Sequence, residues 1–252
     1  MPLLDAFDTP VLMKGFFITG TDTGVGKTML AAWITAFMRS KNMDAMPMKP
    51  VQTGCEMLNG RRISQDLEFC LSAGGVRPGN GIRSYMTPYC FKMAASPHLA
   101  ARVEGKAIRL SVIMRAFKKL AAVHETLIVE GAGGLLVPLN SRTTMLDLIK
   151  HMKLPVLVAA RPGLGTLNHT LMSLNELQRA ECSTAGIVIV ESAAPGRNMI
   201  EKDNRATLRS FSKTPVLGRI KYMDSPDPAG VLTFADQALK SNLERLLKSD
   251  FN

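Results

Sequence analysis

The sequence predicts an α/β fold of three layers, in which a mostly parallel β-sheet is covered by helices on both faces. Short, continuous apolar runs recur along the chain, at 126–129, 155–160 and 185–190. Segments with apolar residues at helical spacing follow such runs, near 166–179 and 198–211. Strands without polar alternation are buried on both faces, and their alternation with helices is typical of a parallel sheet.

The first strand-to-helix unit carries a glycine-rich loop. An apolar run at 16–18 predicts a strand, a helix is expected from Met29 onward, and between them lies Gly20-Thr21-Asp22-Thr23-Gly24-Val25-Gly26-Lys27-Thr28. Unpaired N–H groups and the dipole at the start of such a helix attract a phosphate group. Lys27 can reach the outer phosphates, and the Thr28 hydroxyl can ligate the magnesium that accompanies a nucleotide.

This loop departs by one residue from the usual phosphate-loop pattern, because Thr21 stands where the first glycine of Gly-x-x-x-x-Gly-Lys-[Ser/Thr] belongs. A turn that uses its glycines only for geometry is the structural alternative. The strand–loop–helix context favours a phosphate site and therefore a P-loop NTPase-like fold.

The remaining elements follow in chain order. We expect a strand at 45–48, a helix at 64–72 that Ser64 can cap, a loop at 74–81, and helices at 99–104 and 110–122. After the strands and helices between 126 and 211, we expect a last strand at 215–218. The segment Asp224-Ser225-Pro226-Asp227-Pro228 breaks the chain before a terminal helix at about 232–247.

Length and composition indicate a single domain. We interpret residues 1–12 as a loose N-terminal extension and residues 13–252 as one α/β domain. No apolar run approaches the roughly 20 residues of a membrane span, and the N-terminus lacks the pattern of a signal peptide. We therefore expect a cytoplasmic protein without a membrane partner. The cysteines, which show no C-x-x-C pair, are expected to be reduced thiols: Cys55, Cys70, Cys90 and Cys182.

The formal net charge of +10 is the one property that suggests a nucleic-acid partner. The basic residues are scattered, and aromatic residues make up only 6% of the chain, which leaves few surfaces on which bases could stack. A solvated basic surface with sites for anionic phosphates accounts for the charge better, and we expect no nucleic-acid binding.

Polar residues gather where strands end. Lys49 and Glu130 terminate strands, Asp66 lies early in a helix, and Asn168 lies at a helix start. Ligand sites of open parallel sheets lie beyond the carboxyl ends of the strands. A carboxylate at Glu130, followed by glycines, can bind magnesium beside phosphates. Taken singly, Asp66 is explained better as a helix-start charge facing solvent, and Lys49 could be a surface lysine.

Four segments together resemble the dethiobiotin synthetase family. They are the phosphate loop 20–28, Met48-Lys49-Pro50-Val51-Gln52-Thr53-Gly54, Ser96-Pro97-His98 and Val129-Glu130-Gly131-Ala132-Gly133-Gly134, and Leu167-Asn168-His169 extends the match. The resemblance covers about residues 14–223. It implies a homodimeric, ATP-dependent ligase that forms the ureido ring of dethiobiotin from 7,8-diaminononanoate and CO₂, through a carbamate and a carbamic–phosphoric anhydride.

The resemblance also implies roles for individual residues. Lys27 and Lys49 would be the catalytic cations, and Thr28, Asp66 and Glu130 would hold Mg²⁺. ATP would be bound by Gly24, Val25, Gly26, Lys27, Thr28, Met29, Asp66, Glu130, Gly131, Ala132, Gly133, Val190 and Glu191. The substrate would be bound by Thr23, Thr53, Gly133 and Asn168, with Asn168 facing the substrate carboxylate across the dimer interface.

The chain departs from the family at Val190-Glu191, where an Asn-Asp pair usually contacts adenine, and at Lys221, where a proline is usual. Two other functions fit the same fold. A cargo-positioning or partition-type ATPase would carry a lysine at the position of Asp22, and a non-catalytic nucleotide-binding regulator would not need Lys27, Thr28, Asp66 and Glu130 together.

Overall fold

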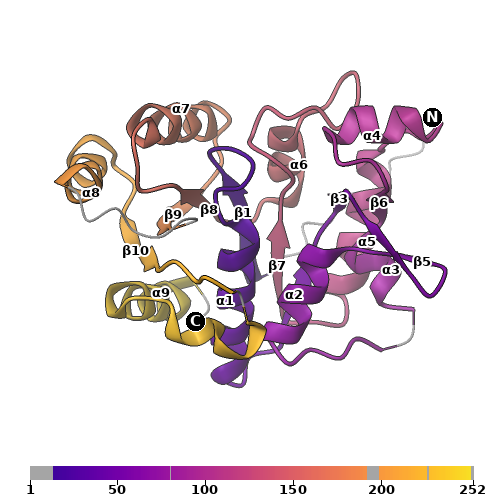
Figure 1. The fold of residues 1–252 in the computed structure, drawn as a ribbon, viewed down its shortest axis with the longest axis horizontal. Coiled ribbons are helices and arrows are strands. Elements are labelled where there is room, and N and C mark those ends of the chain that lie inside the picture. Colours follow the sequence, from indigo (N-terminus) through magenta and orange to yellow (C-terminus); the bar gives the residue numbers. More distant parts are fainter. Residues whose placement is uncertain (1–13, 80, 192–198, 226, 251–252) are drawn as a thin grey trace, which may run out of the picture.

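The computed structural model describes residues 14–79, 81–191, 199–225 and 227–250, and its centre is a six-stranded sheet (Figure 1). The strand order is β10-β9-β8-β1-β7-β2, and every neighbouring pair is parallel. The strands are β1 (Lys14–Gly20), β2 (Ala45–Met48), β7 (Thr126–Glu130), β8 (Val156–Ala160), β9 (Thr184–Val190) and β10 (Val216–Ile220). The predicted parallel sheet is confirmed.

Helices cover both faces of this sheet. On one face lie α1 (Lys27–Ser40) and α9 (Gln237–Asp250), and on the other lie α5 (Leu110–Ala121), α6 (Met145–Met152), α7 (Thr166–Arg179) and α8 (Met199–Phe211). Successive side chains of a strand point to opposite faces. Phe16 and Phe17 accordingly pack into two different hydrophobic clusters, one on each face, and both are fully buried.

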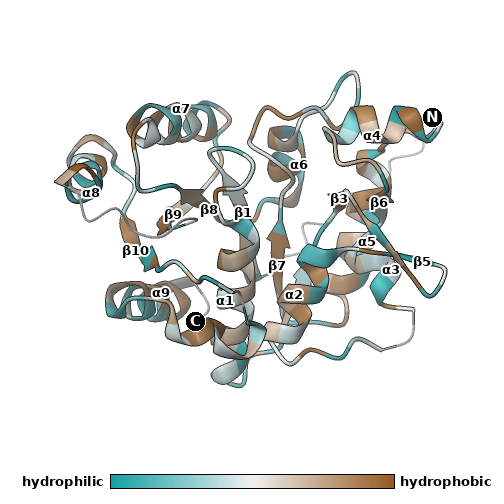
Figure 2. Ribbon diagram, viewed as in Figure 1, coloured by the Kyte–Doolittle hydropathy of each residue, from teal (hydrophilic) through white to brown (hydrophobic). Residues whose placement is uncertain are grey.

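The distribution of hydropathy along the ribbon follows from this layering. Figure 2 shows β7, β9 and β10 as apolar strands, whereas α7 and α8 mix apolar and hydrophilic residues around their circumference. Strands buried on both faces need apolar residues throughout, while an outer helix needs them only where it meets the sheet. Within the described residues, no helix combines the length and apolar character that crossing a bilayer requires.

A smaller subdomain-like region follows β2. It contains β3 (Val51–Thr53), the hairpin β4 (Glu56–Leu58) and β5 (Arg61–Ile63), α2 (Gln65–Ala73), α3 (Arg83–Met86), β6 (Tyr89–Phe91) and α4 (Pro97–Val103). β3 pairs in parallel with β6. Sequence reasoning did not predict β3 to β6 or α3, because each of these elements is only three or four residues long.

Two cysteines of this region are joined, which corrects the expectation of four reduced thiols. Cys55 follows β3, Cys90 lies on β6, and they form a disulfide with a Cα–Cα distance of 6.0 Å. The parallel pairing of β3 with β6 brings together two cysteines that are 35 residues apart. Cys70, which is buried, and Cys182, which is half-buried, are free.

The C-terminal segment also differs from the prediction. A short 3₁₀ helix, η1 (Pro228–Thr233), comes first, and α9 starts only at Gln237. Asp236 accepts hydrogen bonds from the N–H groups of Leu239 and Arg219, so it fixes the start of α9 against β10. The helix α6 was not predicted; Thr144 caps it through a capping box with Asp147. Residues 1–12 lie outside the described residues, and the single domain at 13–252 stays a prediction.

Candidate active site

The glycine-rich loop joins β1 to α1 through residues with positive φ. Gly24 has φ 72° and Gly26, the N-cap of α1, has φ 88°. A Cβ added to Gly26 would lie 2.3 Å from Cγ1 of Val190, so both backbone conformation and space require glycine there. The loop thereby lies against the end of β9 and aims the first N–H groups of α1 at a common point, as an anion site needs.

Lys27, the first residue of α1, is buried although it carries a potential charge. Its side chain is 7% exposed, and its Nζ donates a hydrogen bond to the carbonyl oxygen of Asp22, at 2.7 Å. Burial lowers the pKa of Lys27 to about 8, and the neighbouring ammonium of Lys49 adds to this shift, while Glu130 opposes it. Lys27 is therefore poised to bind an anion that restores its full charge.

The sheet places Lys49 beside Glu130. Met48 of β2 is paired with Val129 of β7, so the residues that follow lie next to each other at the carboxyl edge. Nζ of Lys49 lies 2.6 Å from Oε1 of Glu130 and 3.2 Å from the carbonyl oxygen of Gly131. The side chains of Lys49 and Glu130 are 6% and 4% exposed, so the pair is buried.

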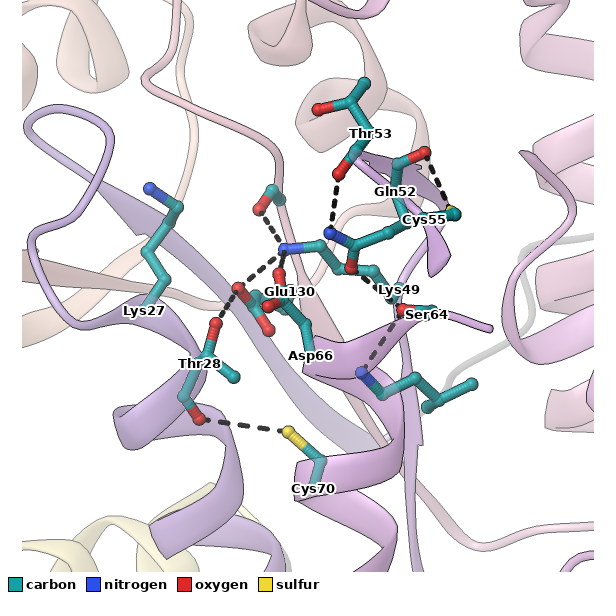
Figure 3. Close-up of polar contacts among 12 residues, drawn as sticks. Lys27, Thr28, Lys49, Gln52, Thr53, Cys55, Ser64, Asp66, Cys70 and Glu130 are labelled. Atoms are coloured by element: carbon teal, nitrogen blue, oxygen red, sulfur yellow. Dashed lines mark hydrogen bonds and ion pairs between the residues drawn. The ribbon is translucent and has the colours of Figure 1, made fainter. Parts of the chain in front are cut away.

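Two further side chains complete this cluster (Figure 3). Oδ2 of Asp66, in the first turn of α2, lies 2.6 Å from Nζ of Lys49. The hydroxyl of Thr28, in the first turn of α1, donates to Oε1 of Glu130 at 2.8 Å. Four distant segments thus meet at one point, and the helix-start charge at Asp66 is part of the cluster rather than a solvent-facing residue.

The cluster balances its charges internally. Burial lowers the pKa of Lys49, but the carboxylates of Glu130 and Asp66 outweigh this effect and raise it. Burial and the nearby Asp66 raise the pKa of Glu130, against the opposing ammonium of Lys49. Cys70, which is buried beside the cluster, has a pKa raised well above its usual value by burial, so it is not a reactive thiolate.

The donor set fits a hard divalent cation. A hydroxyl from Thr28 and carboxylates from Asp66 and Glu130 supply the oxygen atoms that Mg²⁺ prefers, and phosphates and water commonly complete its shell. No group of three or more His, Cys, Asp and Glu residues that could hold a metal occurs in the part of the chain that the structure describes. A magnesium ion here would depend on the nucleotide for further ligands.

A cavity of about 920 Å³ opens over this cluster. Residues that the sequence singled out line much of it: Thr23, Gly24, Gly26, Lys27, Thr28, Met29, Lys49, Thr53, Asp66, Glu130, Ala132 and Gly133. Other lining residues were given no role by sequence reasoning: Val51, Gln52, Gln65, Phe69, Ala94, Ala95, Ser96, Pro97 and Val137. The segments 51–54 and 96–98 belong to the motifs that resemble the family, and this membership was the signal that could have identified their residues.

Three residues predicted to bind ATP have side chains that pack within the protein, so their contact with the nucleotide stays a prediction that only their backbone groups can fulfil. The side chain of Val25 is fully buried, and that of Val190 is 2% exposed and packs against the phosphate loop. The carboxylate of Glu191 is buried and accepts hydrogen bonds from Arg219 and from the N–H of Tyr222. None of the three side chains lines the cavity, because the end of β9 packs beneath the loop.

Gly131 and Asn168, which were also predicted to bind ligands, do not line the cavity. The N–H of Gly131 donates to Ile18 within the sheet, so it is not available to a ligand. Asn168 is exposed on the first turn of α7 and does not line the cavity of its own chain. A role for Asn168 at the substrate stays a prediction that needs a second subunit.

Solved structures with a similar fold include one that contains bound ADP and magnesium. One is McdA from Cyanthece, at 12% identity and a TM-score of 0.57, covering 95% of this chain and 100% of that one. Another is cobyrinic acid a,c-diamide synthase from Mycobacterium smegmatis with bound ADP and magnesium, at 16% identity and 0.57, covering 94% and 96%. At such low identity these likenesses show the P-loop NTPase fold alone.

Sequence comparison is more specific. The family model for an "AAA domain" matches residues 14–229. An ATP-dependent dethiobiotin synthetase from Anaeromyxobacter dehalogenans is 44% identical over 180 residues, which are 70% of this chain and 76% of the relative. That of Halalkalibacterium halodurans is 35% identical over 92% of this chain and 93% of the relative, and that of Clostridium acetobutylicum is 31% identical over 94% and 96%. The chain therefore belongs to the family of ATP-dependent dethiobiotin synthetases.

Proposed function

We propose that this protein uses ATP to close the ureido ring of dethiobiotin from 7,8-diaminononanoate and CO₂. The observation that carries the proposal is the convergence of Lys27, Lys49, Asp66 and Glu130 beside a phosphate loop, in one cavity. Family membership supplies the identity of the reaction.

The reaction proceeds in three steps. An amine of the substrate adds to CO₂ and loses a proton, which gives a carbamate. A carbamate oxygen attacks the γ-phosphorus of ATP, ADP leaves, and a carbamic–phosphoric anhydride forms. The second amine attacks the anhydride carbonyl, closes the ring and expels phosphate, and the proton that this nitrogen loses leaves with the phosphate or with water. No covalent bond to the protein is needed, so positioning and electrostatic stabilisation carry the catalysis.

Negative charge develops between the carbamate and the γ-phosphoryl group, and two fixed cations are available for it. Lys27, at the start of α1, binds the outer phosphates. Lys49 stabilises the carbamate and the transferring phosphoryl group, since its ammonium lies at the cavity wall and is kept charged by Asp66 and Glu130. Thr23 and Thr53, which also line the cavity, orient the amine and carbamate end of the substrate.

Thr28, Asp66 and Glu130 would hold Mg²⁺, which when bound neutralises charge on the β- and γ-phosphates. The N–H groups of Ala132 and Gly133 are candidate donors to the phosphoryl group, as both residues line the cavity.

We further propose that the active unit is a homodimer in the cytoplasm, the compartment that supplies ATP. Asn168 faces the substrate carboxylate of the neighbouring subunit in this arrangement. Leu164 and Met172, which lie four residues before and after Asn168 in the chain, are 86% and 59% exposed, and exposed large apolar side chains of this kind support an interface.

A single assay tests the proposed reaction. Purified protein is incubated with diaminononanoate, bicarbonate, Mg²⁺ and ATP, and both ADP and dethiobiotin are quantified by mass spectrometry. We expect equal amounts of the two products and no ADP when the diamine is left out. ATP turnover that does not need the diamine would instead favour a partition-type ATPase, and ATP binding without turnover would favour a regulator.

A further inference from the structure

The position of Asp66 depends on where α2 begins. Asp66 is the second residue of α2, and Ser64 is the N-cap of this helix. Oγ of Ser64 accepts a hydrogen bond from the N–H of Leu67, at 3.2 Å, and Ser64 is 5% exposed. This contact sets the first turn of the helix and with it the direction in which the Asp66 carboxylate points.

The hydroxyl of Ser64 also makes a second hydrogen bond, which is not part of the N-cap interaction. Oγ of Ser64 donates to Oε1 of Gln52 at 2.8 Å, and Nε2 of Gln52 donates to the carbonyl oxygen of Thr53 at 3.0 Å. Figure 3 shows this chain of contacts running from Thr53 through Gln52 to Ser64, beside the Lys49 cluster. The carboxamide of Gln52 is thus held at both ends and has a single orientation.

These contacts join two walls of the cavity. Gln52 lies on β3 between Lys49 and Thr53, whereas Ser64 begins the helix that carries Asp66. The hairpin β4–β5 separates the two segments in the chain, and its strands are largely exposed. The hydrogen bond between Ser64 and Gln52 crosses the base of this hairpin. It therefore fixes the distance between β3 and the start of α2, which the exposed hairpin alone would not fix. Nε2 of Gln65 adds a weaker contact to the carbonyl oxygen of Gly54, at 3.3 Å.

We infer that Gln52 and Ser64 are positioning residues that hold the Asp66 carboxylate at the metal site and Thr53 at the substrate end. This inference rests on the metal role proposed for Asp66. Neither residue touches the metal; both act through the start of α2 and the end of β3. Hydrogen-bond partners behind a metal ligand typically influence metal affinity or activity by about 10- to 100-fold.

The test uses Mn²⁺ as a paramagnetic probe of the Mg²⁺ site, together with a non-hydrolysable ATP analogue and no diamine. Mn²⁺ affinity is measured by electron paramagnetic resonance for the wild-type protein and five variants, one of which combines Ser64→Ala with Gln52→Leu. Ser64→Ala removes both the N-cap of α2 and the hydrogen bond to Gln52. Gln52→Leu removes only the hydrogen bond between the two residues and keeps the N-cap. Ser64→Thr retains both interactions. Thr144→Ala is the matched control, because Thr144 caps α6, which lines no part of the cavity.

We expect Ser64→Ala and Gln52→Leu to weaken Mn²⁺ binding by about tenfold. The Mn²⁺ affinity of the double variant should lie within about twofold of that of either single variant, because both changes remove the same hydrogen bond between Ser64 and Gln52. Ser64→Thr should stay near wild type. Thr144→Ala should lower the melting temperature as Ser64→Ala does, yet leave Mn²⁺ affinity within about twofold.

Unchanged Mn²⁺ affinity in Gln52→Leu, or an equal loss in Thr144→Ala, would overturn the inference while leaving the proposed reaction intact. Failure of the proposed function has a different signature, since the wild-type protein itself would then show no Mn²⁺ binding with the nucleotide analogue or no diamine-dependent turnover.

Discussion

At the scale of the residue, Lys27 couples nucleotide binding to protonation. With a pKa of about 8 in the free protein, Lys27 is mostly charged at pH 7 and mostly neutral at pH 9. Bound phosphates favour the charged form and raise this pKa. We therefore expect kcat/KM for ATP to be constant below about pH 7 and to fall as the pH rises above 8, because this parameter reports the free enzyme.

The proton that Lys27 takes up when ATP binds can be measured directly. At pH 8, ATP binding should take up about half a proton, which isothermal titration calorimetry in two buffers of different ionisation enthalpy measures. Lys27→Met should bind ATP more weakly and without this uptake. Equal proton uptake in the variant would show that a group other than Lys27 titrates.

Lys49 neutralises two carboxylates, so its removal should affect both activity and stability. We expect Lys49→Ala to lower turnover by about 100-fold, the scale of losing one preorganised charge. It should also lower the free energy of unfolding by about 3–5 kcal/mol without ligands, since the buried Glu130 loses the ammonium that is hydrogen-bonded to it. Turnover and urea unfolding measure the two effects.

A matched control is available for this prediction. Lys41 forms an ion pair with Glu244 on the surface, where both side chains are about half exposed. Lys41→Ala should change stability by less than about 1 kcal/mol and leave turnover unaffected. Near-normal turnover in Lys49→Ala would mean that another cation faces the phosphoryl group.

At the scale of the element, the Cys55–Cys90 disulfide links β3 and β6 immediately next to the cavity-lining residues Gln52 and Thr53. It closes a loop of 35 residues, which typically stabilises the folded state by about 2–4 kcal/mol. Cys90→Ser should lower the free energy of unfolding by this amount under oxidising conditions, and addition of dithiothreitol should bring the wild type to the level of the variant.

Cys182→Ser is the control for this comparison, because Cys182 is a free, half-buried thiol. The number of thiols in protein purified without a reductant is a separate test of the disulfide. Four titratable thiols in protein unfolded under non-reducing conditions would support the reduced state that the sequence predicted.

At the scale of the whole molecule, a shared active site can be tested by complementation. If Asn168 serves the neighbouring subunit, a hybrid of one Lys49→Ala chain and one Asn168→Ala chain contains one intact site and one doubly altered site. Mixing the two inactive variants under conditions of subunit exchange should then restore roughly a quarter of the wild-type activity, because half of the dimers are hybrids. No recovery on mixing would show that Asn168 acts within its own chain, and wild-type activity of Asn168→Ala alone would show that Asn168 has no role.

Local sequence determined much of the fold. The apolar runs predicted β7, β8 and β9, the helical spacing predicted α5 and α7, and Ser64 was correctly expected to cap α2. These features depend on contacts within a few residues, or on burial of a whole strand, and both leave a pattern that can be read from the chain. The phosphate loop belongs to this group, since its strand, glycines and helix are consecutive.

Tertiary structure decided the rest. Lys49 and Glu130 are 81 residues apart, and they meet because β2 pairs with β7 in one register. Asp66 joins them only once α2 packs against α1, and the side chain of Val190 is buried because the end of β9 packs against Gly26 of the phosphate loop. The disulfide likewise required the pairing of β3 with β6. Such contacts depend on strand order and register, which are set by the packing of the whole sheet, so local patterns predict the elements but not which of their ends meet.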